Sequence, residues 1–85
     1  MRHSRNSKAY AALAAWLKKK RLEQGLSIRD LANILDVHPS IVGKIETCMR
    51  KIDAIELIEY CNALGVDPND CTAEVQTVMR GKRLL

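Results

Sequence analysis

Two short segments, residues 28–35 and 39–47, are separated by three residues and constrain the fold more than any other feature. In the first segment, apolar residues recur at i, i+3, i+4 and i+7, which is the pattern of one buried helix face. Ser27 is a favoured N-cap for this segment, and Pro39 suits the first position of the second helix. The sequence therefore predicts two short helices joined by a tight turn.

The remaining sequence is also helical in pattern. No stretch alternates apolar and polar residues for long enough to be a strand, and aromatic residues make up only 4% of the chain. We expect further helices over residues 9–24, which Gly25 ends, over 54–64 after an Asp53 cap, and from Pro68 onward. The prediction is an all-α fold of five helices, with residues 72–85 as a continuation of the fifth helix or a short sixth one.

The charge of the chain is distributed unevenly along it. Eighty-five residues, 47% of them apolar, suffice for one small domain. Residues 1–51 carry 11 Lys and Arg against 4 Asp and Glu, whereas residues 52–79 carry 6 acidic residues and no Lys or Arg. A basic first half of this kind indicates a polyanionic partner, and the acidic second half indicates another role.

Several classes of protein are disfavoured by the residues present. The three cysteines, at positions 48, 61 and 71, form no CxxC pair and have no nearby His, so neither a disulfide framework nor a zinc site is expected. No nucleophile–base pair or Gly-rich phosphate loop indicates an enzyme or a cofactor. No apolar run approaches the length of a membrane span, and the basic residues 18–21 after the first apolar run argue against a signal peptide. We expect a cytoplasmic protein without a cofactor.

The pair of short helices has the dimensions of a helix-turn-helix, whose second helix enters the major groove of DNA. Plotted at helical spacing, this second helix turns Val42 and Ile45 toward the core. Its outer arc is small and polar, with one cation, and holds Ser40, Gly43, Lys44 and Thr47. Small residues allow a close approach to base edges, and Lys44 can donate to guanine O6 or N7. The alternative is a polar helix face that is merely solvated.

Two charged residues lie on the wrong side of their helices. Arg21 falls within the apolar stripe of Leu13 and Leu17, and Glu46 falls on the core side of its own helix. Because an unpaired buried charge is strongly destabilising, each residue needs a partner of opposite charge. We therefore predict a buried Arg21–Glu46 ion pair that links the first helix to the third.

These features together resemble the Cro/repressor-type (XRE-like) helix-turn-helix family over residues 17–71. The similarity is carried by Arg21-Leu22-Glu23-Gln24-Gly25-Leu26-Ser27, Leu31-Ala32, Leu35-Asp36-Val37, Val42-Gly43-Lys44-Ile45-Glu46 and Leu64-Gly65-Val66. The chain departs from the family at three positions, with Ile28 in place of a usual Gln and with Asp36 and Cys48 in place of usual glycines. The resemblance implies a lambda-repressor-like domain, and it also implies the Arg21–Glu46 pair.

The resemblance further implies which residues meet DNA. Positions at or near the bases correspond to His38, Pro39, Ser40, Gly43 and Lys44, and positions near phosphates include Ile28, Arg29, Thr47 and Lys51. Arg50 joins Lys51 as a phosphate candidate because both lie in the loop after the recognition helix. Pro39 and Gly43 leave this helix without the Asn, Gln or Arg side chains that read bases by two hydrogen bonds.

The sequence as a whole predicts a sequence-specific, DNA-binding transcriptional regulator of bacterial or phage type that binds double-stranded DNA. We expect a flexible basic N-terminus at residues 1–8, the helix-turn-helix domain at 9–71 and a C-terminal helical extension at 72–85. A stripe in this last part, formed by Cys71, Val75, Val78 and Met79, is the candidate surface for a homodimer. The alternatives are an antitoxin of the same fold that binds a toxin, and a protein-interaction module that has lost DNA binding.

Overall fold

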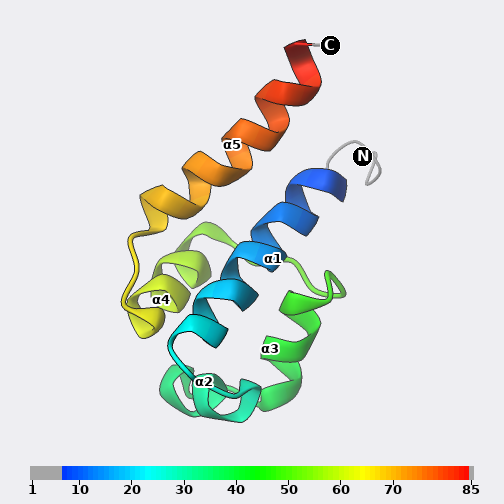
Figure 1. Ribbon diagram of the computed structural model, residues 1–85. Coiled ribbons are helices and arrows are strands. Elements are labelled where there is room, and N and C mark those ends of the chain that lie inside the picture. Colours follow the sequence, from blue (N-terminus) through cyan, green and yellow to red (C-terminus); the bar gives the residue numbers. More distant parts are fainter. Residues whose placement is uncertain (1–6, 85) are drawn as a thin grey trace.

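The computed structural model describes residues 7–84, and within them the side chains of residues 8–81. The described chain is entirely helical outside its turns and loops (Figure 1), which confirms the all-α prediction. The five helices are α1 (Ser7–Glu23), α2 (Ile28–Leu35), α3 (Pro39–Glu46), α4 (Ala54–Leu64) and α5 (Pro68–Leu84). Six of the residues of the expected flexible N-terminus, 1–6, lie outside the described part. No helix of the described part is long and apolar enough to cross a membrane.

Helices α2 and α4 begin directly after residues whose side chains cap them. Ser27 accepts a hydrogen bond from the Asp30 N–H while the Asp30 carboxylate accepts one from the Ser27 N–H, so both form a capping box on α2. Asp53 and Glu56 form the same arrangement on α4. These bonds satisfy backbone donors that a first helical turn leaves without partners, and they place α2 and α4 where the sequence predicted them.

The turns between helices require left-handed backbone at four positions. Gly25 and Gly65 have φ of 72° and 70° and end α1 and α4. Asp36 and Cys48 have φ of 58° and 63°, a backbone conformation that residues other than Gly rarely adopt. These last two are the positions at which the related family usually has Gly, so the chain keeps the turn geometry without the glycines.

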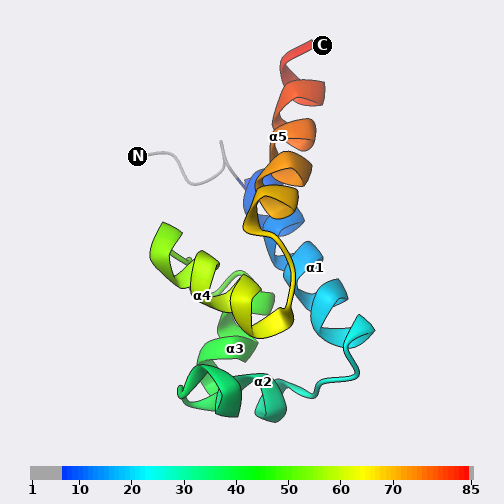
Figure 2. The same ribbon diagram turned by 90° about the vertical axis from the view of Figure 1, so that its left-hand side faces the viewer.

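The core lies where α1, α2, α3 and α4 meet. Its fully buried side chains include Leu17, Leu31, Val42, Leu64 and the large ring of Tyr60. α2 and α3 pack on each other below α1, and Figure 2 shows α4 above α3 and to the left of α1. Leucine, isoleucine and valine side chains from helices far apart in the sequence thus hold the two short helices in place.

The fifth helix continues without a break through residue 72, where we expected the C-terminal extension to begin. It runs back along α1 in the opposite direction, and its last turns project beyond the other helices (Figures 1 and 2). Cys71 is fully buried in this packing and is therefore not part of an outer stripe, which corrects its place among the dimer candidates. Val75 and Val78 are half-buried, and Met79 is exposed.

Candidate nucleic-acid interface

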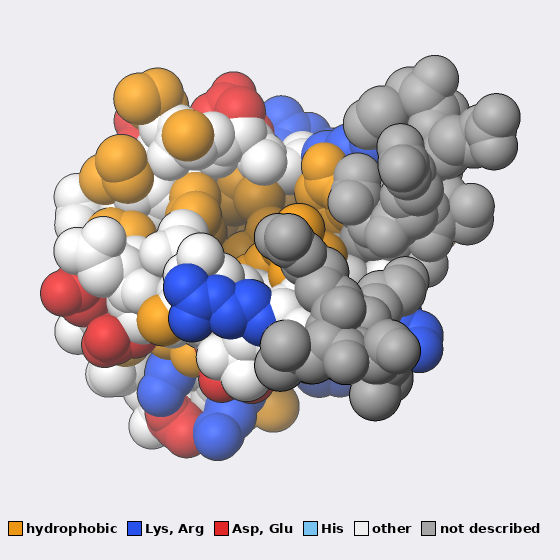
Figure 3. All heavy atoms as spheres, turned by 90° about the horizontal axis from the view of Figure 1, so that it is seen from above, with side chains coloured by type: hydrophobic (Ala, Val, Ile, Leu, Met, Phe, Trp, Pro, Cys, Tyr) orange, Lys and Arg blue, Asp and Glu red, His pale blue; other side chains and the backbone are white. Residues whose placement is uncertain are grey.

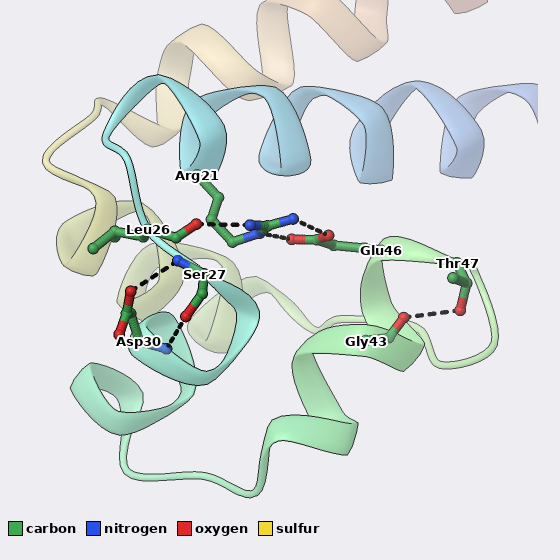
Figure 4. Close-up of polar contacts among 7 residues, drawn as sticks. All are labelled: Arg21, Leu26, Ser27, Asp30, Gly43, Glu46 and Thr47. Carbon is green, nitrogen blue, oxygen red and sulfur yellow. Dashed lines mark hydrogen bonds and ion pairs between the residues drawn. The ribbon is translucent and has the colours of Figure 1, made fainter.

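Arg21 and Glu46 form the predicted ion pair between the end of α1 and the end of α3 (Figure 4). Arg21 Nε lies 2.6 Å from Glu46 Oε2, and Nη2 lies 3.0 Å from Oε1. The remaining nitrogen, Nη1, donates to the Leu26 carbonyl at 2.7 Å. Only 7% and 4% of the two side chains are exposed. Glu46 raises the pKa of Arg21 above its ordinary value, so the guanidinium stays charged and fixes the angle of α3.

The turn before α3 positions the start of that helix. The Asp36 N–H donates to Asn33, and the Val37 N–H donates to the Ala32 carbonyl at 3.0 Å. His38 then caps α3, because its Nδ1 accepts a hydrogen bond from the Ser40 N–H at 3.1 Å. The Ser40 hydroxyl lies 2.9 Å from the same nitrogen. Nδ1 is therefore engaged in the cap of α3, and Nε2 is the ring nitrogen that takes no part in it.

The outer face of α3 matches the arc expected from helical spacing. Ser40 and Lys44 are exposed, whereas Val42 and Ile45 are buried. A Cβ added at Gly43 would have no atom within 4 Å, so this part of the helix presents bare backbone. α3 therefore offers a small, polar surface with the ammonium of Lys44 as its cation, a shape that allows the helix to approach the edges of base pairs closely.

Two of the expected contact residues are held by bonds within the protein. The Thr47 hydroxyl donates to the Gly43 carbonyl at 2.8 Å, so its proton is directed at its own helix (Figure 4). Arg50 forms a two-point ion pair with Glu56, at 2.8 Å and 3.2 Å, and its Nη1 also lies 3.2 Å from the Lys51 carbonyl. This pairing raises the pKa of Arg50 and lowers that of Glu56. Arg50 thus orders the loop rather than projecting as a solvated cation.

The cations Arg29, Lys51 and Lys20 have different surroundings. Arg29 is exposed on α2. Lys51 is exposed in the loop, and its ammonium lies 5.0 Å from the centre of the Tyr10 ring, within cation–π range. On α1, Lys20 lies 5.3 Å from the Trp16 ring centre and 3.3 Å from Glu23.

Sequence reasoning missed the Arg50–Glu56 pair and the stacking of Lys51 on Tyr10. The Arg50–Glu56 pair could have been predicted from nearby sequence, because Glu56 is the third residue of a helix that begins a few positions after a basic loop. The second joins residues 41 positions apart with no matching pattern in the sequence. In the described part of the chain, no group of His, Cys, Asp and Glu is arranged to hold a metal ion.

Comparison with known proteins gives a consistent result. A family profile described as Helix-turn-helix matches residues 17–71. An XRE-family like protein from Pseudomonas syringae pv. tomato is 28% identical, with a TM-score of 0.81 over 88% of this chain and 92% of that one. The clp gene regulator ClgR from Corynebacterium glutamicum is 28% identical in one structure, with a TM-score of 0.75 over 84% of this chain and 92% of that one. No curated protein sequence matches the chain.

Proposed function

Because this chain belongs to the XRE-type helix-turn-helix family and is a DNA-binding transcriptional regulator, we propose that it reads a specific DNA sequence by placing α3 in the major groove. The observation that carries this proposal is the Arg21–Glu46 pair together with the bare outer face of α3. The pair holds α3 at a fixed angle beneath α1, and the face it turns outward has no bulky side chain to keep the helix away from the bases.

The base contacts that we propose come from the start and the outer arc of α3. Lys44 donates to a guanine, since its ammonium is the one cation on this arc. Ser40 and His38 lie at the N-terminal end of the helix, where a recognition helix enters the groove. Pro39 and Gly43 contribute close backbone approach rather than hydrogen bonds from side chains.

Phosphate contacts flank the recognition helix in this proposal. Arg29 on α2 and Lys51 in the loop after α3 are exposed cations in the elements that precede and follow α3 along the chain. Thr47 contributes by turning its hydroxyl proton from the Gly43 carbonyl to a phosphate oxygen, and Arg50 contributes chiefly by holding the loop through Glu56. The excess of Lys and Arg over residues 1–51 supplies the long-range attraction to DNA.

The proposal includes a homodimer, because a protein of this size reads one half-site and operators of helix-turn-helix dimers present two, one helical turn apart. The projecting end of α5 supports it, since Val78 is half-buried there and Met79 is 45% exposed. Met79→Glu should shift the chain toward monomer in sedimentation equilibrium. Thr77→Glu, an exposed position on the opposite side of α5, is the matched control and should leave the dimer intact.

Fluorescence anisotropy with a duplex selected from random DNA and a scrambled duplex tests the DNA contacts. Lys44→Ala should lose about 1–3 kcal/mol of binding free energy on the selected duplex and little on the scrambled one. Lys51→Ala should weaken both duplexes alike and lower the salt dependence by about one unit. Lys19→Ala, an exposed charge on the outer face of α1, is the control for charge alone. Equal losses for Lys44→Ala on both duplexes would contradict base reading by α3.

A further inference from the structure

An apolar cavity of about 390 Å³ lies between the first half of α1 and the loop that follows α3. Its walls come from three parts of the chain and are lined by Tyr10, Leu13, Ala14, Ile45, Cys48, Arg50, Lys51 and Ile52. Figure 3 looks down on the face where the N-terminal end of α1 lies, and apolar side chains line a hollow in it. The volume is within the range of about 300–1,000 Å³ that is usual for small-molecule sites.

The chemistry of the lining selects a class of ligand. The walls are hydrocarbon and aromatic, from residues such as Leu13, Ile45 and Ile52, and they suit an apolar body. Two lining residues are charged, Arg50 and Lys51; both are cations, and both lie on the loop after α3. Arg50 is paired with Glu56, and the Lys51 ammonium lies over the Tyr10 ring, so both are held at the rim. An anionic group at the rim and an apolar group inside match this distribution of charge.

We propose that this cavity binds a small amphipathic anion, an apolar body that carries one carboxylate, and that its occupation weakens DNA binding. The first part stands on the cavity alone, and the second rests on the proposed function. A carboxylate beside Lys51 competes with DNA phosphates for the same ammonium. An apolar body packed against Cys48 and Ile52 contacts the loop that follows the recognition helix. By linkage, DNA must weaken ligand binding by the same factor.

The thiol of Cys48 provides a direct readout of the cavity. Cys48 is exposed and lines the cavity, whereas Cys61 and Cys71 are fully buried. Octanoate should therefore slow the reaction of Cys48 with iodoacetamide, by about fivefold or more at saturation if the site is occupied. Octylammonium and 1-octanol, which share the apolar body and lack the negative charge, should protect the thiol much less. No protection by octanoate, or equal protection by octylammonium, overturns the proposal.

Two variants locate the effect. Ala14→Phe fills the cavity and should abolish protection, while Ala11→Phe, the same change at an exposed position of α1, should retain it. Lys51→Met removes the ammonium but keeps an unbranched side chain that is only one atom shorter, and it should remove the preference for octanoate over 1-octanol. This second variant decides the matter if Ala14→Phe does not fold. Unchanged protection in both variants would place the octanoate elsewhere and overturn the site.

The antagonism is measured separately, by anisotropy of the selected duplex with and without octanoate. Saturating octanoate should raise the Kd of the wild-type chain for DNA by about fivefold or more and leave that of Ala14→Phe unchanged. An unchanged Kd for the wild type overturns the antagonism. If the wild type binds no duplex at all, the proposed function fails, whereas the thiol experiment still decides whether the cavity takes the anion.

Discussion

Arg21 and Glu46, 25 residues apart in the sequence, are joined by two hydrogen bonds in a nearly solvent-free setting. The third nitrogen of the Arg21 guanidinium, Nη1, donates to the Leu26 carbonyl in the loop between α1 and α2. One side chain therefore ties together α1, the loop that leads into α2, and the recognition helix α3. This group therefore fixes the angle between α1 and α3 together with the apolar packing of the core.

Removing one partner of the pair leaves the other charged and buried. Arg21→Met should lower the free energy of unfolding by about 3–5 kcal/mol, and the double variant Arg21→Met/Glu46→Leu should recover most of that loss. Urea unfolding followed by circular dichroism measures both. A loss well below 1 kcal/mol for the single variant would show that the charge is solvated in the folded protein.

Replacing Asp36 by Gly should stabilise the protein. The residue has φ of 58°, and a left-handed conformation costs an L-residue about 1–2 kcal/mol. Gly also makes the unfolded chain more flexible, which offsets about 0.4–1 kcal/mol of this stabilisation. We therefore expect the free energy of unfolding to rise by about 0.5–1 kcal/mol, measured by thermal or urea unfolding. Asn33→Gly, within α2, is the control and should destabilise by about 0.5–1 kcal/mol.

The hydroxyl group of Tyr60 is buried, and it has no hydrogen-bond partner among the described residues. Burial also raises the pKa of this phenol above its ordinary value. Because a buried polar group without a partner is destabilising, Tyr60→Phe should raise the free energy of unfolding by about 1 kcal/mol. Tyr10→Phe, at a half-buried ring, should change it little. A destabilised Tyr60→Phe protein would mean that the hydroxyl is satisfied in solution.

The stability of the protein should fall as the pH is lowered below the ordinary Glu pKa of 4.5. Hydrogen bonds from Arg50 and from the Asp53 N–H hold the pKa of Glu56 below that value in the folded state. The unfolded chain then binds a proton at higher pH than the folded chain, so stability is lost as the pH falls toward the folded pKa. Glu56→Gln should flatten this acid limb in unfolding midpoints measured from pH 6 to pH 3 (about the range of carboxylate titration). Glu59→Gln, exposed on the same helix, should leave the limb in place.

Truncation after Asp70 should destabilise the domain. α5 packs along α1, and Cys71 at its first turns is fully buried. Its removal exposes apolar surface of α1, so we expect a loss of at least about 2 kcal/mol, comparable with loss of a large core side chain. Truncation after Arg80 removes only the projecting end and serves as the control. A truncated chain that unfolds at the wild-type urea midpoint would contradict the packing role of α5.

The sequence by itself determined the features that depend on neighbours a few residues away. The caps at Ser27 and Asp53 and the end of α1 at Gly25 rest on hydrogen bonds and φ values set within about four residues. The Arg21–Glu46 pair was also predictable, although it spans the fold, because each charge interrupts an apolar stripe and only an opposite charge satisfies it.

Only the tertiary structure decided how the surface cations are used and where α5 lies. Arg50 and Lys51 are adjacent in the sequence, yet one pairs with Glu56 and the other lies over Tyr10. The different contacts of these two cations depend on the left-handed turn at Cys48 and on α1, which carries Tyr10, lying beside the loop. Neither feature is a local property of a basic loop. In the same way, the stripe that begins at Cys71 has the same helical spacing whether it packs on α1 or on a second chain. The surface that covers this stripe depends on which apolar surface the folded core leaves exposed. The hydrophobic effect is non-directional, so the spacing of the side chains alone does not identify the surface on which they pack.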